Sequence, residues 1–509
     1  MTRNSIPVPG PSPLRVPAGT STPKAQSKAC YNCRRRRLRC DRSVPSCRKC
    51  STSGEQCLGY GTVLRWANAP AVRGKLAAPM HVARERNSAC VLTEHGTPSF
   101  VNRALLDPFL NGLGRRARHY VHHFTTTVCR DLVSVDQPNH NPFRTIVPLA
   151  GNFSFLSAIV IATGAMHLAA LNSYQNHPTR PELIDALAAK DKAIRLLRSA
   201  LADHRDITPP QTRAVLLAAT VFFINIDLID SGKGGWQAHM EAAIALMSNL
   251  HSGSSNLNAL SPSLVSLVDA IAADCLTYCV LGSIISGVVP ETWVQQDLAA
   301  RGLFSILRRA EPYSYHCCPP EILQINLAAS GLYGIDAVEA RAEAAAALLR
   351  QAREFGITQW VHGIRGLAPD DDLDVRVSLA SAHRAAACLY ILLAVPEVTI
   401  SDFSPEMLVQ EVIEHLAMVS IEHVLVKGTV WPTFMAGAQT DDLQLRKWCL
   451  DRMQALGAKN PWMCPWGYIR TAIQVLQHLW AARDAVPERE PKISWLREIK
   501  AMRDKCLIV

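Results

Sequence analysis

The sequence predicts two unlike parts, a small metal-nucleated module near the N-terminus and a large all-α domain of stacked helical pairs. Three observations lead to this fold class. Six of the 16 cysteines lie within residues 30–57. From about residue 101 onward, apolar residues recur at helical spacing, and signals for β-strands are scarce. Of the 509 residues, 48% are apolar and 19% are charged, which is typical of a chain that folds around a large core.

We divide the chain into four parts. Residues 1–27 are expected to form a disordered Pro-rich arm, residues 28–60 the cysteine-rich module, residues 61–100 a linker, and residues 101–509 the all-helical domain. The first 23 residues hold six prolines and no apolar segment typical of a signal peptide. Without a secretory signal we expect a reducing compartment, in which the cysteines are not a disulfide framework.

The cysteines of the small module predict a pair of zinc ions. Their spacing is C-x2-C-x6-C-x6-C-x2-C-x6-C, in which the unit C-x2-C-x6-C occurs twice. A tetrahedral zinc site takes four ligands, so six thiolates complete two sites only when two sulfurs each bind both ions. The repeat favours Cys30 and Cys47, the first cysteine of each copy, as bridges. Because apolar residues are few here, metal binding supplies the folding free energy of this zinc-nucleated module, and its predicted ligands are Cys30, Cys33, Cys40, Cys47, Cys50 and Cys57.

A run of arginines, RRRRLR at residues 34–39, lies between the second and third cysteines. Residues 1–100 contain 17 Lys or Arg against 4 Asp or Glu, whereas the net charge of the whole chain is +10. Such a local excess indicates a binding site for a polyanion. Arginine donates paired hydrogen bonds to guanine and charge-assisted bonds to phosphate, so double-stranded DNA is the expected partner. We expect a helix over residues 34–39, with five arginines spread around it, so that some contact bases and others contact phosphates.

The six spaced cysteines, the basic run and Pro45 before the fourth cysteine together resemble the fungal zinc binuclear cluster family of transcription factors. The resemblance implies two short helices held by the cluster, the first of which enters the DNA major groove. It also implies that Arg36 and Arg37 read bases, with Arg37 as the main reader, and that Leu38 packs inward. The implied phosphate contacts are Arg34, Arg39, Arg48 and Lys49. The family usually has lysine at both base-reading positions, where this chain has arginine, and its typical target is a CGG triplet. Because arginine can also read guanine, we expect a G-rich triplet.

The same resemblance implies a sequence-specific regulator of RNA polymerase II genes in a fungal nucleus. Its expected targets are a metabolic or secondary-metabolite gene cluster, and its expected partners include the transcription machinery. Many relatives dimerise through a coiled coil directly after the cluster, but residues 61–100 contain no sustained heptad repeat. We therefore expect a monomer on DNA or a homodimer formed through the helical domain. In the linker, Arg65, Arg73 and Lys75 are candidates for further phosphate contacts.

Several segments of the large domain have clear helix signals. The apolar residues expected on a shared face are Leu183, Leu187, Ile194, Leu197 and Leu201 in one helix and Trp236, Met240, Ile244, Met247 and Leu250 in another. A third helix is expected to end at Gly356, and a fourth to start at Ser404 and Pro405. The segments that resemble the regulatory domain accompanying many of these factors are residues 122–150, 224–246 and 430–440. This second resemblance implies roles in regulation and dimer contacts.

Two apolar stretches, residues 155–171 and 214–229, have the composition of membrane spans. Both are shorter than the roughly 20 residues that a span needs. Polar side chains also interrupt them, His167 in the first and Asn225 and Asp227 in the second. We expect both to be buried helices of a soluble domain, with no membrane partner.

No catalytic constellation is recognisable, so we expect the protein not to be an enzyme. The segment SGKGG at residues 231–235 lacks the spacing of a phosphate-binding P-loop and is expected to be a turn. The polar residues expected on helix surfaces or at helix ends are His122, His123, Asp131, Asp136, Asp227 and Asp230. Cys275 and Cys279 lie one helical turn apart without further ligands at metal-binding spacing, and we expect them in the core with the remaining cysteines.

Two other functions compete with sequence-specific DNA binding. A zinc module can also bind RNA or a protein partner, but single-stranded RNA is usually bound on aromatic platforms, and only Tyr31 and Tyr60 flank the basic run. A metabolic enzyme with an attached zinc module would need catalytic residues that the sequence does not reveal. The residue pattern therefore favours DNA binding.

Overall fold

The computed structural model describes residues 28–60, 110, 112–137, 140–174, 180–203, 209–251, 259–287, 303–367, 369, 372–398, 403–459, 465–485 and 494–509. The chain forms two compact units, one within Met1–Val101 and the other within Asn102–Val509, and each is described by itself. Several predictions lie outside the described residues. They concern the arm at 1–27, the linker at 61–100 with Arg65, Arg73 and Lys75, and two of the expected core cysteines, Cys90 and Cys464.

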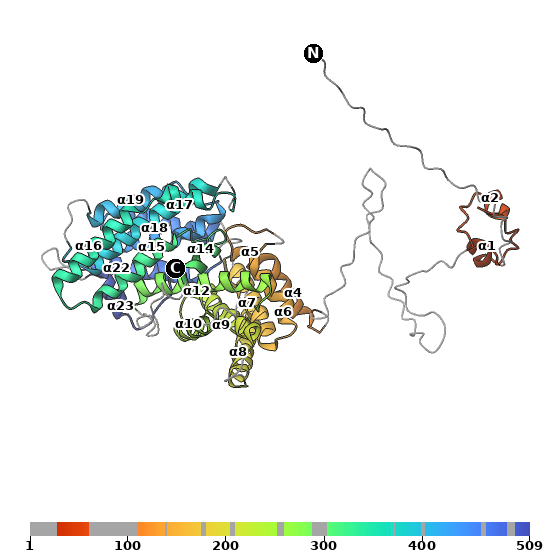
Figure 1. The fold of residues 1–509 in the computed structure, drawn as a ribbon, viewed down its shortest axis with the longest axis horizontal. Coiled ribbons are helices and arrows are strands. Elements are labelled where there is room, and N and C mark those ends of the chain that lie inside the picture. Colours follow the sequence, from red (N-terminus) through yellow and green to blue (C-terminus); the bar gives the residue numbers. More distant parts are fainter. Residues whose placement is uncertain are drawn as a thin grey trace, which may run out of the picture. The chain divides into compact units, whose positions relative to one another are not determined.

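The smaller unit contains two short helices, α1 (Tyr31–Arg35) and α2 (Arg48–Thr52), which contact each other (Figure 1). Its buried residues are Cys30, Cys33, Cys47 and Cys50, with Cys40, Cys57 and Tyr60 packed against them. An interior of thiol groups with so little hydrocarbon cannot supply the free energy of folding through the hydrophobic effect alone. The structure therefore agrees with a module that metal binding folds.

The described elements of the larger unit are all helices. In chain order they are α4 (Arg115–His123), the π-helix η1 (Phe124–Val128), α5 (Cys129–Asp131), the 3-10 helix η2 (Pro142–Thr145), α6 (Ile146–Ala150), α7 (Ser154–Tyr174), α8 (Arg180–Asp203), α9 (Pro210–Asp230), α10 (Trp236–His251), α12 (Pro262–Ser286), α14 (Leu303–Ala310), α15 (Pro320–Gly331), η3 (Leu332–Gly334), α16 (Val338–Glu354), α17 (Ile357–Gly363), α18 (Leu373–Ala394), α19 (Pro405–Ala417), η5 (Val424–Thr429), α20 (Val430–Gln439), α21 (Leu443–Lys459), α22 (Gly467–Asp484) and α23 (Trp495–Ala501). The most extensive contacts join consecutive helices, namely α7 with α8, α18 with α19, and α9 with α10. The predicted all-α domain of stacked helical pairs is confirmed.

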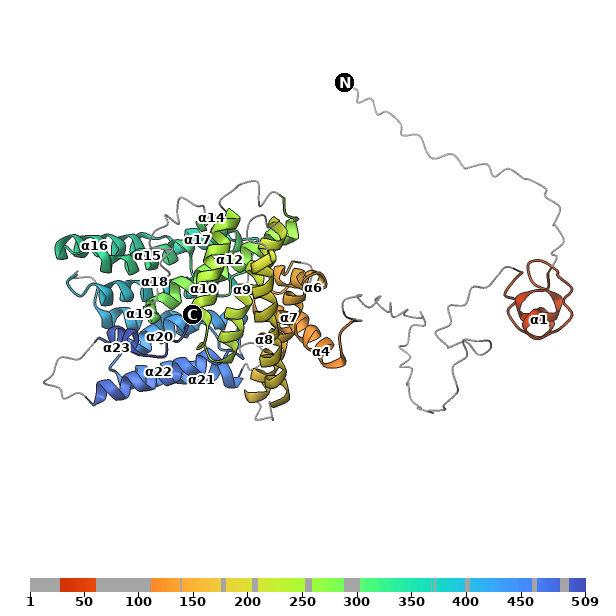
Figure 2. The same ribbon diagram turned by 90° about the horizontal axis from the view of Figure 1, so that it is seen from below.

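Helix α12 lies at the centre of the larger unit. Figure 2 shows most of the helices from α15 to α23 in stacked layers, while α7, α8, α9 and α12 run across them. Helix α12 contacts helices of both groups, including α9, α15 and α23. From Leu267 to Ser286 every residue of α12 is buried, so this largely apolar helix is covered around its whole circumference. Helices from distant parts of the sequence thus share one core.

Four helices are long and apolar enough to cross a membrane, judged by length and composition alone. They are Ser154–Ser173, Pro210–Asp230, Pro262–Ser286 and Leu373–Ala394. Within the folded unit, between 72% and 89% of the apolar window of each helix is buried. The two stretches singled out from the sequence lie in α7 and α9, and they are buried helices of a folded unit as expected.

The expected apolar faces differ in outcome between two helices. In α10, all five predicted residues from Trp236 to Leu250 are buried, so this prediction is confirmed. In α8, Leu187 is 52% exposed and Leu201 is 40% exposed, so the predicted face is wrong in part. The residues of α8 that are fully buried include Ala186 and Ala193. Small side chains let α8 approach α7 closely, and a pattern read from the large apolar residues alone misses such a contact.

The predicted helix ends and the turn are mostly confirmed. The Ser404 side chain accepts a hydrogen bond from the Met407 N–H at 3.1 Å, and α19 begins at Pro405. Helix α16 ends at Glu354, two residues before the predicted Gly356. In the turn at residues 231–235, Gly232 has φ +70°, and a Cβ there would lie 2.7 Å from the Tyr468 Cβ. Only glycine fits this close approach without displacing its neighbour.

Candidate metal centre and nucleic-acid interface

The C-x2-C units build the start of each short helix. In α1 the Cys30 Sγ accepts a hydrogen bond from the Cys33 N–H at 3.4 Å, and in α2 the Cys47 Sγ accepts one from the Cys50 N–H at 3.4 Å. The first cysteine of each unit is therefore the N-cap residue, and the second lies one turn later on the same side. This local geometry brings two sulfurs of each unit together before any contact between the helices forms.

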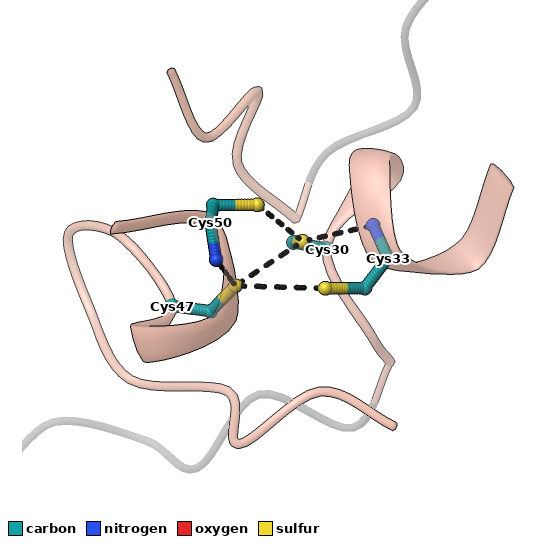
Figure 3. Close-up of side chains that lie close together, drawn as sticks. All are labelled: Cys30, Cys33, Cys47 and Cys50. Atoms are coloured by element: carbon teal, nitrogen blue, oxygen red, sulfur yellow. Dashed lines mark hydrogen bonds between the residues drawn. The ribbon is translucent and has the colours of Figure 1, made fainter. Parts of the chain in front are cut away.

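The two pairs of sulfurs then meet in one cluster (Figure 3). The Cys30 Sγ lies 3.6 Å from the Cys47 Sγ and 3.8 Å from the Cys50 Sγ, and the Cys33 Sγ lies 3.7 Å from the Cys47 Sγ. A tetrahedral zinc with Zn–S bonds of about 2.3 Å holds its sulfurs about 3.8 Å apart. These sulfur–sulfur distances therefore fit zinc. Cys30 and Cys47 each lie close to two other sulfurs, as a bridging ligand must.

The remaining two cysteines lie at the margin of this cluster. The Cys40 Sγ accepts a hydrogen bond from the Cys30 N–H at 3.4 Å, and its sulfur groups with Cys47 and Asp41 within 4.8 Å. Cys57 is half-buried and packs against the four buried cysteines. Burial raises the pKa of Cys50 to about 12, so a cation is needed to stabilise a thiolate there. The structure thus brings all six predicted ligands into one place.

The predicted helix over residues 34–39 is wrong, because α1 ends at Arg35. Arg37 adopts the left-handed conformation with φ +55°. The Leu38 N–H donates to the Cys33 carbonyl at 2.9 Å and the Arg37 N–H to the Arg34 carbonyl at 3.4 Å. These two bonds are those of a Schellman motif, which terminates a helix. The chain turns away there, and Leu38, which was expected to pack inward, is 44% exposed.

The second half of the unit repeats this backbone at an offset of 17 residues. At the end of α2, the Glu55 N–H donates to the Cys50 carbonyl at 3.0 Å and the Gly54 N–H to the Ser51 carbonyl at 3.3 Å. Gly54 has φ +67° and corresponds to Arg37. A second left-handed position follows in each half, at Arg42 (φ +62°) and at Gly59 (φ +69°). The sequence repeat is therefore also a structural repeat.

All six predicted DNA-contacting side chains are exposed: Arg34, Arg36, Arg37, Arg39, Arg48 and Lys49. Two further exposed arginines, Arg35 and Arg42, belong to the same surface but were not among the predicted contacts. The sequence repeat aligns Arg42 with Gly59, 17 residues later. This alignment of an arginine with a glycine is the signal that could have drawn attention to Arg42. The exposed cations supply hydrogen-bond donors in and next to the two short helices.

Two carboxylates interrupt this basic surface. Arg36 pairs with Glu55 at 2.7 Å, which joins the end of α1 to the segment after α2. Asp41 accepts a hydrogen bond from the Arg48 N–H at 2.9 Å and so caps the start of α2. Hydrogen bonds from the Ser43 hydroxyl and from the Arg48 N–H lower the pKa of Asp41 to about 2. Neither acidic residue was singled out from the sequence.

Most of the acidic and imidazole groups singled out from the sequence have structural partners among the described residues. His167 lies between His123 and Asp131, at 3.0 Å from each, and burial lowers the pKa of His123 to about 3. Asp136 pairs with Arg144 through two bonds of 2.7 Å. Asp227 pairs with Lys190 at 2.5 Å, Asp230 accepts from Ser231, and Cys275 and Cys279 are buried. The described residues thus give these groups roles in packing and helix pairing.

Two family models match this chain. The fungal Zn(2)-Cys(6) binuclear cluster domain matches residues 28–67, and the fungal specific transcription factor domain matches residues 119–325 and 330–508. The acriflavine sensitivity control protein acr-2 of Neurospora crassa is 42% identical over 95% of this chain and 97% of its own length. The phomenoic acid biosynthesis cluster-specific transcriptional regulator of Leptosphaeria maculans is 20% identical over 90% of this chain and 86% of its own length. No solved structure matches the chain.

Proposed function

Because this chain belongs to the fungal transcription factors with a Zn(2)-Cys(6) binuclear cluster, we propose that it reads a G-rich, CGG-like triplet of double-stranded DNA and so regulates RNA polymerase II genes. The family implies a DNA-binding regulator in the nucleus, with two zinc ions in its cluster domain. In this proposal all six cysteines are ligands, and Cys30 and Cys47 bridge the two ions. The zinc ions, when bound, cross-link helices that have few apolar contacts of their own.

The observation that carries the proposal is the conformation of Arg37. A non-glycine residue in the left-handed region costs roughly 1–2 kcal/mol, so the fold alone favours glycine at this position. The equivalent position of the other half is Gly54. An arginine that the backbone disfavours, exposed like the other cations named above, supports a role in binding. We assign Arg37 as the main base reader, with Arg36 beside it.

The other cations are proposed to contact phosphates and so to fix the orientation of the module on the duplex. These proposed contacts are Arg34, Arg39, Arg48 and Lys49, to which we add Arg42. Arg34 lies over the Tyr31 ring at 5.9 Å, which restricts the position of its guanidinium. The N-terminal half of the unit therefore supplies most of the proposed DNA contacts, while α2 adds two phosphate contacts.

The target genes are proposed from the relatives. A metabolic or secondary-metabolite gene cluster agrees with the relative whose title names the phomenoic acid biosynthesis cluster, at 20% identity. A second candidate is a set of genes that determines sensitivity to toxic compounds, because the relative at 42% identity is titled a control protein for acriflavine sensitivity. Mapping of bound sites across a fungal genome, followed by transcript measurement in a deletion strain, separates these two candidates.

The helical unit is proposed to contact the transcription machinery and to form a homodimer. Apolar side chains exposed on α8 support a protein contact there, with Ile184 63% exposed and Leu187 52% exposed. Light scattering of the full chain measures the oligomeric state. We expect a dimer that Leu187→Asp weakens, and a strictly monomeric wild-type chain would contradict the homodimer.

DNA binding itself is tested by fluorescence anisotropy of the full chain with a CGG-containing duplex and a scrambled duplex across a range of salt concentrations. With about five phosphates engaged, the slope of log affinity against log salt is expected to be roughly −4 to −5. A slope near zero, or equal affinity for both duplexes at every salt concentration, would contradict the proposal.

A further inference from the structure

A cavity of about 960 Å³ opens in the larger unit where the C-terminal ends of α12 and α18 meet α23. This volume lies at the upper end of the range typical of small-molecule sites, about 300–1,000 Å³. The cavity shares no residue with the groups that the proposed reading of DNA uses, because its described lining belongs entirely to the helical unit. Its described lining residues combine hydroxyl groups, apolar surface and two cations, and no Asp or Glu is among them.

One of the two cations, Lys500, contacts the Tyr333 side chain and has no carboxylate partner among the residues that the structure describes. Its Nζ lies 4.4 Å from the centroid of the Tyr333 ring and 3.4 Å from the Tyr333 hydroxyl. Burial, followed by the nearby charge of Lys505, lowers the pKa of Lys500 to about 8. A lysine whose charge is disfavoured in this way gains free energy when an anion approaches it.

Gly287 explains how the Lys500 stem fits at the end of α12. Gly287 has φ +69°, and a Cβ there would lie 2.8 Å from the Lys500 Cγ. The glycine that ends α12 therefore leaves room for the lysine to lie across the helix terminus. The Lys500 stem packs against Gly287, and the ammonium group lies over the Tyr333 ring. These two contacts position the ammonium group at the cavity.

The second cation, Arg497, lies three residues before Lys500 on α23, so both side chains share one face of that helix. Arg497 is exposed, and its side chain makes no hydrogen bond or ion pair with the described part of the chain. Glu397 is the acidic group that its charge reaches, but Glu397 already pairs with Arg341 at 2.8 Å. The mouth of the cavity thus carries a guanidinium and an ammonium group that no carboxylate neutralises among the described residues.

The remaining lining is suited to an apolar body. Tyr390, Leu393 and Leu496 line the cavity together with Tyr333. The Tyr390 side chain is almost fully buried and forms part of the cavity wall. Its aromatic ring offers apolar surface to a bound molecule.

We infer that this cavity binds a small amphipathic anion, whose acidic head lies between Arg497 and Lys500 and whose apolar or aromatic body packs against Tyr390. The chemical class is an organic acid such as a carboxylate or sulfonate with a hydrocarbon or aromatic body. Charge-assisted hydrogen bonds from the two cations fix the head, and burial of the body supplies the hydrophobic part of the affinity. This site goes beyond the proposed reading of DNA and does not depend on it.

The test uses two fluorescent probes that differ by one charged group. The first is 8-anilino-1-naphthalenesulfonate, and the second is N-phenyl-1-naphthylamine, which has the same rings without the sulfonate. With the full chain we expect tight binding of the sulfonate, and the double variant Arg497→Met/Lys500→Met should bind it about tenfold more weakly. Affinity for the neutral amine should be unchanged by the double variant.

The matched control is Arg350→Met, which removes an exposed cation of α16 and should leave the affinity for both probes unchanged. The variant Lys500→Arg keeps the positive charge and should retain most of the wild-type affinity for the sulfonate. Because Arg497 is exposed, the single variant Arg497→Met keeps the test valid if the double variant misfolds, and it should lower sulfonate affinity severalfold. Sulfonate binding that resists these substitutions, or an equal loss for the neutral amine, would overturn the inference.

Discussion

The two halves of the cysteine-rich unit share one backbone but carry different side chains at its two left-handed positions. In the first half these positions are Arg37 and Arg42, and in the second half they are Gly54 and Gly59. Both halves use a cysteine N-cap and end their helix in a Schellman motif. Glycine meets the backbone requirement at lower cost, so the arginines of the first half serve a purpose other than folding. The first half therefore combines the shared fold with the proposed base contacts, whereas the second half adds only two proposed phosphate contacts.

The largest expected effect comes from breaking what both halves share. Cys30→Ser should remove zinc from both sites and unfold the smaller unit, because the Cys30 sulfur lies 3.6–3.8 Å from both sulfurs of the other pair, those of Cys47 and Cys50. Cys40→Ser changes a cysteine at the margin and should leave more zinc bound than Cys30→Ser does. Elemental analysis of the purified full chain gives the zinc content. Circular dichroism should still show a folded helical unit in both variants, and two zinc equivalents in Cys30→Ser would refute bridging.

The next prediction exchanges the residues that distinguish the halves. Arg37→Gly should keep both zinc ions and stabilise the smaller unit by roughly 1–2 kcal/mol, while it lowers discrimination between CGG and scrambled duplexes by about 1–3 kcal/mol. The reciprocal variant Gly54→Arg meets no atom within 4 Å of its new Cβ. It should therefore fold, at a cost of roughly 1–2 kcal/mol, and gain no discrimination.

Zinc-chelator competition measures stability for this pair, and anisotropy with the two duplexes measures discrimination. The two quantities are expected to move in opposite directions only in Arg37→Gly. If Arg37→Gly weakens binding to both duplexes by the same factor, Arg37 contacts a phosphate and the assignment of the base reader is wrong.

A smaller effect is expected from the second half, whose cations lie on α2. Lys49→Ala should weaken binding to every duplex alike. The slope of log affinity against log salt should become less negative by about 0.9, the value for one phosphate contact. Discrimination between duplexes should stay at the wild-type value. A change in preferred sequence would move Lys49 from the phosphate contacts to the base contacts.

The sequence predicted the chemistry of the cluster better than its backbone. The spacing of the cysteines led to six ligands that do lie together, because C-x2-C spacing alone brings two sulfurs to one helix turn. It could not reveal that α1 ends at Arg35, since a left-handed arginine contradicts the usual preference of that position for glycine. In the helical domain, periodicity predicted α10 correctly but not α8, where small residues form the contact. The cavity beside Lys500 depends on helices far apart in sequence, and no local pattern indicates it.

The smallest expected effect concerns the ion pair that crosses between the halves. Arg36 and Glu55 are each 47% exposed, so their pairing contributes only about 0.2–1 kcal/mol to stability. Glu55→Gln should leave zinc content unchanged, free the guanidinium for DNA and raise affinity for all duplexes by up to about fivefold at low salt. Glu339→Gln makes the same change of charge at the start of α16 in the other unit and should alter affinity far less, because it leaves the Arg36–Glu55 pair intact. If both variants raise affinity equally, net charge is responsible and Glu55 has no local role. If Glu55→Gln lowers affinity instead, the carboxylate orients Arg36 toward the duplex, and the second half then contributes to base reading through that contact.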